Sequence, residues 1–120
     1  MSFDGVNDYV TFGPNKIGPQ INGASAITMS VWAKPSAFPG VSAGARMISF
    51  QANDVTGGTM RLYDGGKIQV GGRSLYSEAY QSATATANLP LLNEWYFITG
   101  ILDFANDKVY VCLLYTSRCV

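Results

Sequence analysis

The sequence predicts an all-β protein, an antiparallel β-sandwich, and three observations support this prediction. The segment Ile27–Ala33 alternates with a period of two, as a strand with one buried face does. Runs rich in β-branched and aromatic residues are separated by clusters of Gly, Asn, Asp and Pro, which close turns. No segment shows the apolar period of a helix. The chain has 120 residues, of which 48% are hydrophobic, and this is enough for one domain with its own core.

The first expected strands lie near the amino terminus. Ser2–Phe3 and Tyr9–Phe12 are short extended runs on either side of a turn at Asp4–Asp8. Ile27–Lys34 follows after a long connection, and its apolar side is expected to face the core. Trp32 lies inside this run, so we expect it to be a core residue and not a platform for a ligand.

The middle of the chain is expected to form four strands. Asp, Gly and Gly separate two of these runs between Tyr63 and Lys67, which predicts a hairpin. The flanking connections at residues 35–46 and 72–80 are long enough to be functional loops or covers over the sandwich. The four expected strands are Met47–Gln51, Thr59–Tyr63, Lys67–Gly71 and Gln81–Ala87.

The last two expected strands form a second hairpin. Trp95–Leu102 is apolar on both sides, so we expect a central, well-buried strand with Trp95 in the core. Asp103–Asp107 is the expected turn, and Lys108–Cys112 is the strand that follows it.

The carboxyl end is unusual. Residues 113–120 follow the last expected strand without a turn or a cap, and they resemble the translation of sequencing-adapter DNA. We therefore expect a partial domain at residues 1–112, a sandwich incomplete at its carboxyl end, and a non-native tail at residues 113–120. A genuine final strand is the alternative. Cys112 and Cys119 both lie here, so the first 111 residues fold without a disulfide.

Charge and hydropathy narrow the range of partners. Eight basic and eight acidic residues give a net charge of zero, and the basic residues are scattered along the chain. A nucleic-acid partner would require a clustered basic face, so we expect none. No apolar run approaches the roughly 18 residues of a membrane span, and no export leader precedes Ser2. We expect the chain to be part of a longer polypeptide that is extracellular or virion-associated.

Three segments carry a resemblance to a known family, and they are Phe3-Asp4-Gly5-Val6-Asn7-Asp8-Tyr9-Val10, Met29-Ser30-Val31-Trp32-Ala33-Lys34-Pro35 and Leu89-Pro90-Leu91-Leu92-Asn93-Glu94-Trp95. Together they resemble the laminin G-like jelly-roll modules of the concanavalin A-like lectin/glucanase superfamily, which open with Phe-Asp-Gly-x-x-Asp-Tyr-Val. The resemblance covers roughly residues 2–112 and implies a jelly-roll sandwich. An immunoglobulin-like sandwich is the competing fold, but its cysteines would lie on either side of the core tryptophan.

The resemblance makes glycoside hydrolysis the enzymatic activity to consider, and this reaction needs two carboxyl groups facing each other across a cleft. The hydrolases of the superfamily carry a Glu-x-Asp-x-x-Glu strand, which is absent here. The only glutamates are Glu78 and Glu94, and the aspartates lie in turns. The chain has no histidine, which excludes histidine-based catalytic triads and zinc sites. We expect no catalytic residues and no enzymatic activity.

Calcium is the one metal that the resemblance implies, because rim loops of laminin G-like modules often bind it through aspartate and backbone oxygens. Two groups are candidates: Asp4 with Asp8, and Asp103 with Asn106 and Asp107. The alternative is that these side chains only close turns. We expect no required cofactor.

Recognition of a glycan or a protein surface requires exposed aromatic rings with polar groups beside them. A sugar ring could stack on a tyrosine while charged or amide groups meet its hydroxyls, although Tyr76 and Tyr80 could instead merely cover the edge of the sandwich. The candidate ligand-binding residues are Tyr63, Arg73, Tyr76, Glu78, Tyr80 and Gln81.

The expected function is therefore a noncatalytic, lectin-like recognition or adhesion module that binds carbohydrate. A purely structural phage tail or decoration domain is the first alternative. A fragment of a glycoside hydrolase is the second.

Overall fold

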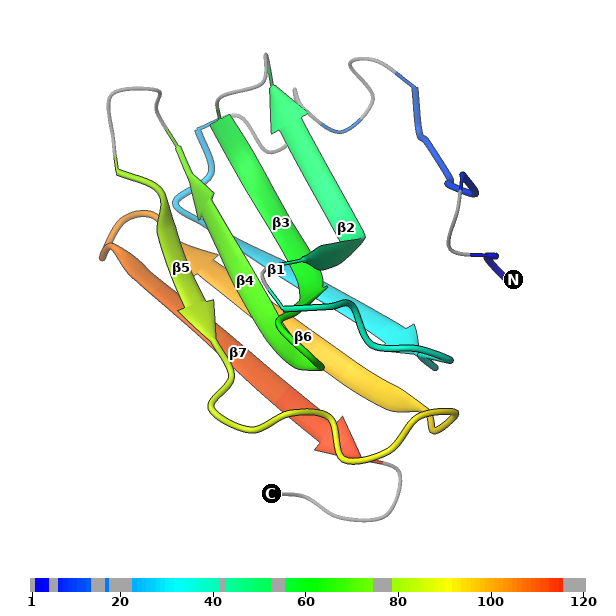
Figure 1. The fold of residues 1–120 in the computed structure, drawn as a ribbon. Helices are drawn as coiled ribbons and strands as arrows, with labels where there is room; N and C mark the ends of the chain where they lie inside the picture. Colours follow the sequence, from blue (N-terminus) through cyan, green and yellow to red (C-terminus); the bar gives the residue numbers. More distant parts are fainter. Residues whose placement is uncertain are drawn as a thin grey trace.

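The computed structural model describes residues 2–4, 7–13, 17, 23–41, 43–52, 56–74 and 79–115. All regular elements in this part of the chain are strands, and they form two antiparallel sheets that pack face to face (Figure 1). The predicted all-β antiparallel sandwich is therefore confirmed. Among the described residues there is no helix of the length and apolarity that crossing a membrane requires.

The first sheet has three strands in the order β1-β6-β7. These are β1 (Ala26–Ala33), β6 (Tyr96–Asp103) and β7 (Lys108–Tyr115). The predicted central position of the strand after Trp95 is confirmed, since β6 pairs with both neighbours. Alternate residues of β6 are buried against the other sheet, as the period of two requires.

The second sheet has four strands in the order β2-β3-β4-β5. They are β2 (Gly44–Ala52), β3 (Thr56–Tyr63), β4 (Lys67–Arg73) and β5 (Gln81–Thr84). The predicted hairpin joins β3 to β4, and its three turn residues all have positive φ, at 45° for Asp64, 73° for Gly65 and 114° for Gly66.

The core lies between the two sheets. Apolar side chains from both sheets meet there, and each contributes roughly 1.5–3 kcal/mol by burial. Gly100 on β6 lets the sheets approach, because a Cβ atom there would lie 2.5 Å from Cγ2 of Val70 on β4. The buried apolar residues are Met29, Met60, Leu62, Ile68, Val70, Leu89, Tyr96, Ile98 and Leu102.

The two strands predicted at the amino terminus are wrong. The described residues of Ser2–Phe3 and Tyr9–Phe12 are not in strands, and the segment runs beside the sandwich instead of within it (Figure 1). Tyr9 is 80% exposed. An extended run becomes a strand only when another strand pairs with its backbone, and no described strand pairs with these residues.

The prediction that both tryptophans belong to the core is also wrong. Trp32 is 55% exposed and Trp95 is 49% exposed. Trp32 lies on the outward side of β1 because it is three residues from the buried Met29, an odd number that reverses the face. It packs beside Phe97 of β6, with ring centroids 5.3 Å apart.

The last strand is longer than predicted. β7 runs to Tyr115 instead of ending at Cys112, and its last three residues pair with β6 from Tyr96 to Ile98. β5 is shorter than predicted and ends at Thr84.

Cys112 is an exposed free thiol. Cys119 lies outside the described residues, and the non-native tail at residues 113–120 stays a prediction.

Candidate binding face

A row of polar side chains crosses the outer face of the four-stranded sheet. Arg46 of β2 lies opposite Arg61 of β3, and Arg61 lies opposite Gln69 of β4. Gln69 in turn lies opposite Thr84 of β5. Residues that are directly opposite in neighbouring strands point to the same side of a sheet. These four residues, one from each strand, form what we call the polar row.

The pattern of burial places the polar row on the outside. Arg61 lies between the buried Met60 and Leu62, and Gln69 lies between the buried Ile68 and Val70. Side chains alternate across a strand, so the residues between buried neighbours must face solvent. The register of β2 shifts between Arg46 and Ile48, as at a β-bulge, which lets Arg46 face outward while Ile48 packs against the core.

Hydrogen bonds connect most of the polar row. The Arg61 Nε–H donates to Oε1 of Gln69 at 2.7 Å, and the Gln69 Nε2 donates to the Thr84 hydroxyl at 2.9 Å. The Gln69 amide is therefore held in one orientation by a neighbour on each side. Groups fixed in this way lose less entropy when a ligand binds.

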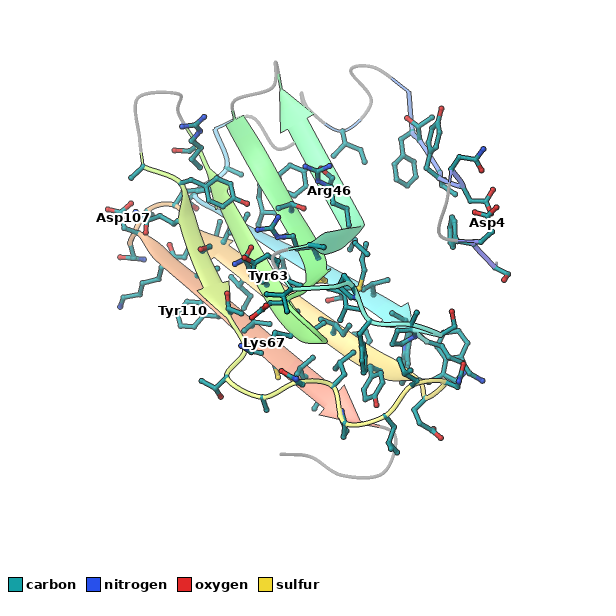
Figure 2. All side chains as sticks on the ribbon, viewed as in Figure 1. Asp4, Arg46, Tyr63, Lys67, Asp107 and Tyr110 are labelled. Carbon is teal, nitrogen blue, oxygen red and sulfur yellow. The ribbon has the colours of Figure 1, made fainter. Side chains whose placement is uncertain are left out.

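Tyr63 flanks the polar row on one side. Its ring centroid lies 4.6 Å from the Arg61 guanidinium carbon, which is within the range of a cation–π contact. Gly44 lies beneath both side chains, since a Cβ atom there would be 3.1 Å from the Arg61 Cδ and 3.5 Å from the Tyr63 Cδ2. Figure 2 shows Arg46 and Tyr63 at the β2 and β3 strands of the four-stranded sheet.

Tyr80 flanks the polar row on the other side. Its ring covers Gly71 of β4, where a Cβ atom would lie 2.6 Å from the Tyr80 Cε1. Burial raises the pKa of the Tyr80 hydroxyl, while the charges of Arg61 and Arg46 act to lower it. Even so, 49% of the Tyr80 residue remains exposed.

Charges on this face are not evenly balanced. Lys67, at the start of β4, pairs with Asp64 at 3.2 Å. Neither Arg46 nor Arg61 forms an ion pair with a described residue. The positive charge of the polar row is therefore not neutralised by the part of the chain that the structure describes.

The structure brings some of the predicted ligand-binding residues together. Tyr63 and Tyr80 both border the polar row, whereas Gln81 lies at the edge strand opposite Gly72 and outside the polar row. Arg73 ends β4 and is half-buried. Tyr76 and Glu78 lie outside the described residues.

Sequence analysis missed all four members of the polar row. Arg61 and Gln69 could have been found, because each occupies the polar position between two apolar residues in a predicted strand. Their alignment with Arg46 and Thr84 depends on strand register, which has no local signal.

The residues predicted to bind calcium form turn hydrogen bonds. The Asp103 carboxylate accepts from both the backbone N–H and the side-chain amide of Asn106, and Asp107 has a φ of 51°. The Asp4 N–H donates to Oδ2 of Asp8 at 2.9 Å. No group of three or more His, Cys, Asp or Glu gathers among the described residues. Calcium binding and turn closure by these residues both stay open as alternatives.

The outer face of the three-stranded sheet differs in chemistry. Trp32 lies opposite Phe97, and Phe97 lies opposite Leu114, so an apolar row crosses all three strands. Tyr110 of β7 is exposed and points to the same side of the sheet as Leu114, four residues earlier in the strand. We call these four residues the apolar face.

A hollow of about 380 Å³ lies between the end of β5 and the middle of β7. Residues 84–87 and 111–113 line it. It has neither an aromatic ring nor a charged group in its lining, so it offers less to a ligand than the polar row does.

Comparison with known proteins concerns nearly the whole chain. A family model described as the concanavalin A-like lectin/glucanases superfamily, from its laminin G group, matches residues 4–113. This range includes all strands of both sheets except the last two residues of β7. No curated protein and no solved structure matches the chain.

Proposed function

Because the chain belongs to the concanavalin A-like lectin/glucanase superfamily as a laminin G-like module, we propose that it is a noncatalytic recognition module that binds carbohydrate. The proposed site is the outer face of the four-stranded sheet. One observation carries the proposal: a hydrogen-bonded polar row is bordered by an accessible tyrosine on each side, Tyr63 and Tyr80.

This arrangement suits the chemistry of sugars. A sugar presents an apolar ring face and a rim of hydroxyl groups, so its recognition requires aromatic surface next to donors and acceptors. Tyr63 and Tyr80 supply the rings, and Gln69 and Thr84 supply amide and hydroxyl groups of fixed orientation. The site is the face of a sheet and not an enclosed pocket that buries most of its ligand, so we expect weak binding.

The proposal excludes catalysis at this face. Hydrolysis of a glycosidic bond needs two carboxyl groups about 5 to 10 Å apart. The polar row and its two tyrosines contain no carboxyl group, and the nearby Asp64 is engaged with Lys67. We further propose that the module works in a longer polypeptide, extracellular or virion-associated, whose partner is a glycan or a protein surface.

A glycan array with the folded 120-residue chain tests the proposal. We expect binding to at least one class of polysaccharide, reduced at least fivefold by Tyr63→Ala and by Tyr80→Ala. Tyr110→Ala is the matched control, because Tyr110 is an exposed tyrosine on the opposite sheet. Circular dichroism should show each variant folded. An array without any bound glycan, or equal losses in all three variants, would contradict the proposal.

The apolar face supports a second candidate function, that of a purely structural module such as a phage tail or decoration domain. Contiguous apolar surface outside the core often marks contact with another protein. Under this candidate, Trp32→Ser should abolish association with the neighbouring domain of the longer polypeptide, measured by sedimentation, and Tyr80→Ala should leave it unchanged. The reverse result would reject the structural role.

A further inference from the structure

We propose that the glycan is acidic and that Arg46 and Arg61 form a subsite for the carboxylate group of a uronic acid. The inference rests on the proposed function and names its class of ligand. The juxtaposition that carries it is two arginines, directly opposite each other on β2 and β3, with the rings of Tyr63 and Tyr80 on the same sheet.

The pairing of Arg46 with Arg61 is unfavourable for the sheet alone. Cβ atoms of directly opposite residues lie about 4.5–5.5 Å apart, and like charges at this separation destabilise a sheet. Neither arginine gains an ion pair with a described residue in return. An anion bound between them would convert this repulsion into two attractions.

Arg61 is already oriented for such a ligand. Its Nε is bound to Gln69, and the Tyr63 ring lies against the guanidinium group, so the plane of the group is fixed. The Nη atoms remain for a ligand, because no described residue accepts from them. A fixed guanidinium plane suits a planar carboxylate, which accepts two parallel hydrogen bonds from it.

Tyr80 adds a third group on the same sheet. Burial raises the pKa of its hydroxyl, and the charges of Arg61 and Arg46 act to lower it. Because burial has the larger effect and raises that pKa, the hydroxyl is protonated at neutral pH and can donate a hydrogen bond. Its ring, held over Gly71, remains available to the sugar that carries the carboxylate.

The number of charges favours a uronic acid over a nucleic acid. A nucleic acid presents one phosphate per nucleotide and is bound by several cations along its backbone. Here two unpaired cations lie together between two tyrosines, while Lys67 is neutralised by Asp64. This pattern fits one carboxylate on a sugar chain.

Isothermal titration calorimetry with short oligouronides tests the inference. The probes are oligogalacturonate, oligomannuronate and oligoglucuronate, each beside its methyl ester, which keeps the sugar chain and removes the charge. We expect at least one free acid to bind tenfold more tightly than its ester. Arg46→Gln and Arg61→Gln should each reduce the difference in affinity between acid and ester about tenfold, whereas Tyr63→Ala should weaken acid and ester equally and keep that difference.

Two further variants sharpen the test. Arg61→Lys keeps the charge and loses the planar group, so we expect a loss of severalfold for the acid. Lys108→Gln removes a cation from the other sheet and should change nothing. Equal binding of acid and ester, or tighter binding of sulfated dextran than of every uronide, would overturn the inference. Binding to neutral glycans alone would overturn it and leave the proposed function standing, whereas binding to no glycan would reject both.

Discussion

The Tyr96 hydroxyl and the backbone of Leu91 exchange two hydrogen bonds. The hydroxyl donates to the Leu91 carbonyl oxygen at 2.8 Å and accepts the Leu91 N–H at 3.1 Å. The Tyr96 side chain is part of the core, with 2% of the residue exposed, so β6 fixes the connection that precedes it. The same connection is tied to the β3–β4 turn, because the Leu89 N–H donates to the Gly66 carbonyl oxygen.

Tyr96→Phe should therefore destabilise the protein. The substitution keeps the buried ring but leaves two backbone groups of Leu91 without their partner, and we expect the free energy of unfolding to fall by about 1–2 kcal/mol. Urea denaturation measures the change. Tyr110→Phe is the control and should shift stability by less than about 0.5 kcal/mol, because it is an exposed surface site. Equal stability of the two variants would contradict the role given to the Tyr96 hydroxyl.

Gly100→Ala should force the two sheets apart. The new Cβ would lie 2.5 Å from Cγ2 and 2.8 Å from Cγ1 of Val70, so we expect a loss of about 1–3 kcal/mol in urea denaturation. Adding Val70→Ala removes both clashing methyl groups, so the double variant should be more stable than the sum of the single changes predicts. Gly40→Ala has open space around it and should be nearly neutral. Strict additivity of the two core changes would refute direct contact.

The phenol of Tyr80 should make stability depend on pH in alkaline solution. Burial raises its pKa above the usual value of 10.0, so the folded protein holds this proton after the unfolded chain has lost it. The free energy of unfolding should therefore fall as the pH rises above about 10, where the unfolded state binds fewer protons. The fall should be smaller in Tyr80→Phe, as measured by urea denaturation from pH 8 to 11. An identical slope in both proteins would contradict the burial of this phenol.

The charges next to Tyr80 give an independent measurement. Arg61 and Arg46 lower the pKa of its hydroxyl, so Arg61→Gln should move the phenol absorbance change to higher pH. The signal of Tyr80 is obtained by subtracting the titration of the Tyr80→Phe variant. A shift to lower pH would show that the guanidinium group does not face the phenol.

Calcium should leave the melting temperature unchanged. Both Asp103 carboxylate oxygens already accept hydrogen bonds from Asn106 within the turn, so we expect this group to act as a turn-closing residue. Melting curves in chelator and in millimolar Ca²⁺ check this expectation. Asp103→Ala should cost about 1 kcal/mol in both solutions. A midpoint several degrees higher in Ca²⁺ would instead favour a metal site.

The sequence by itself determined the local structure of this protein. The alternation in Ile27–Ala33 correctly assigned the core-facing side of β1, and the Asp-Gly-Gly turn correctly joined β3 to β4. These features depend on residues that are neighbours in the chain. The resemblance to laminin G-like modules was also visible in short segments, and the family match confirms it.

Only the tertiary structure decided which residues face a ligand. Trp32 has the hydrophobicity of a core residue. The alternation of side chains along β1 nevertheless places it on the outer face of the sheet, beside Phe97. The Tyr9–Phe12 run has the composition of a strand and remains unpaired among the described residues. Arg46 and Arg61 lie fifteen positions apart in sequence and meet because β2 and β3 pair in one register. Side-chain alternation is a local property of a strand, whereas pairing and register are set by contacts between distant segments, which no single segment encodes.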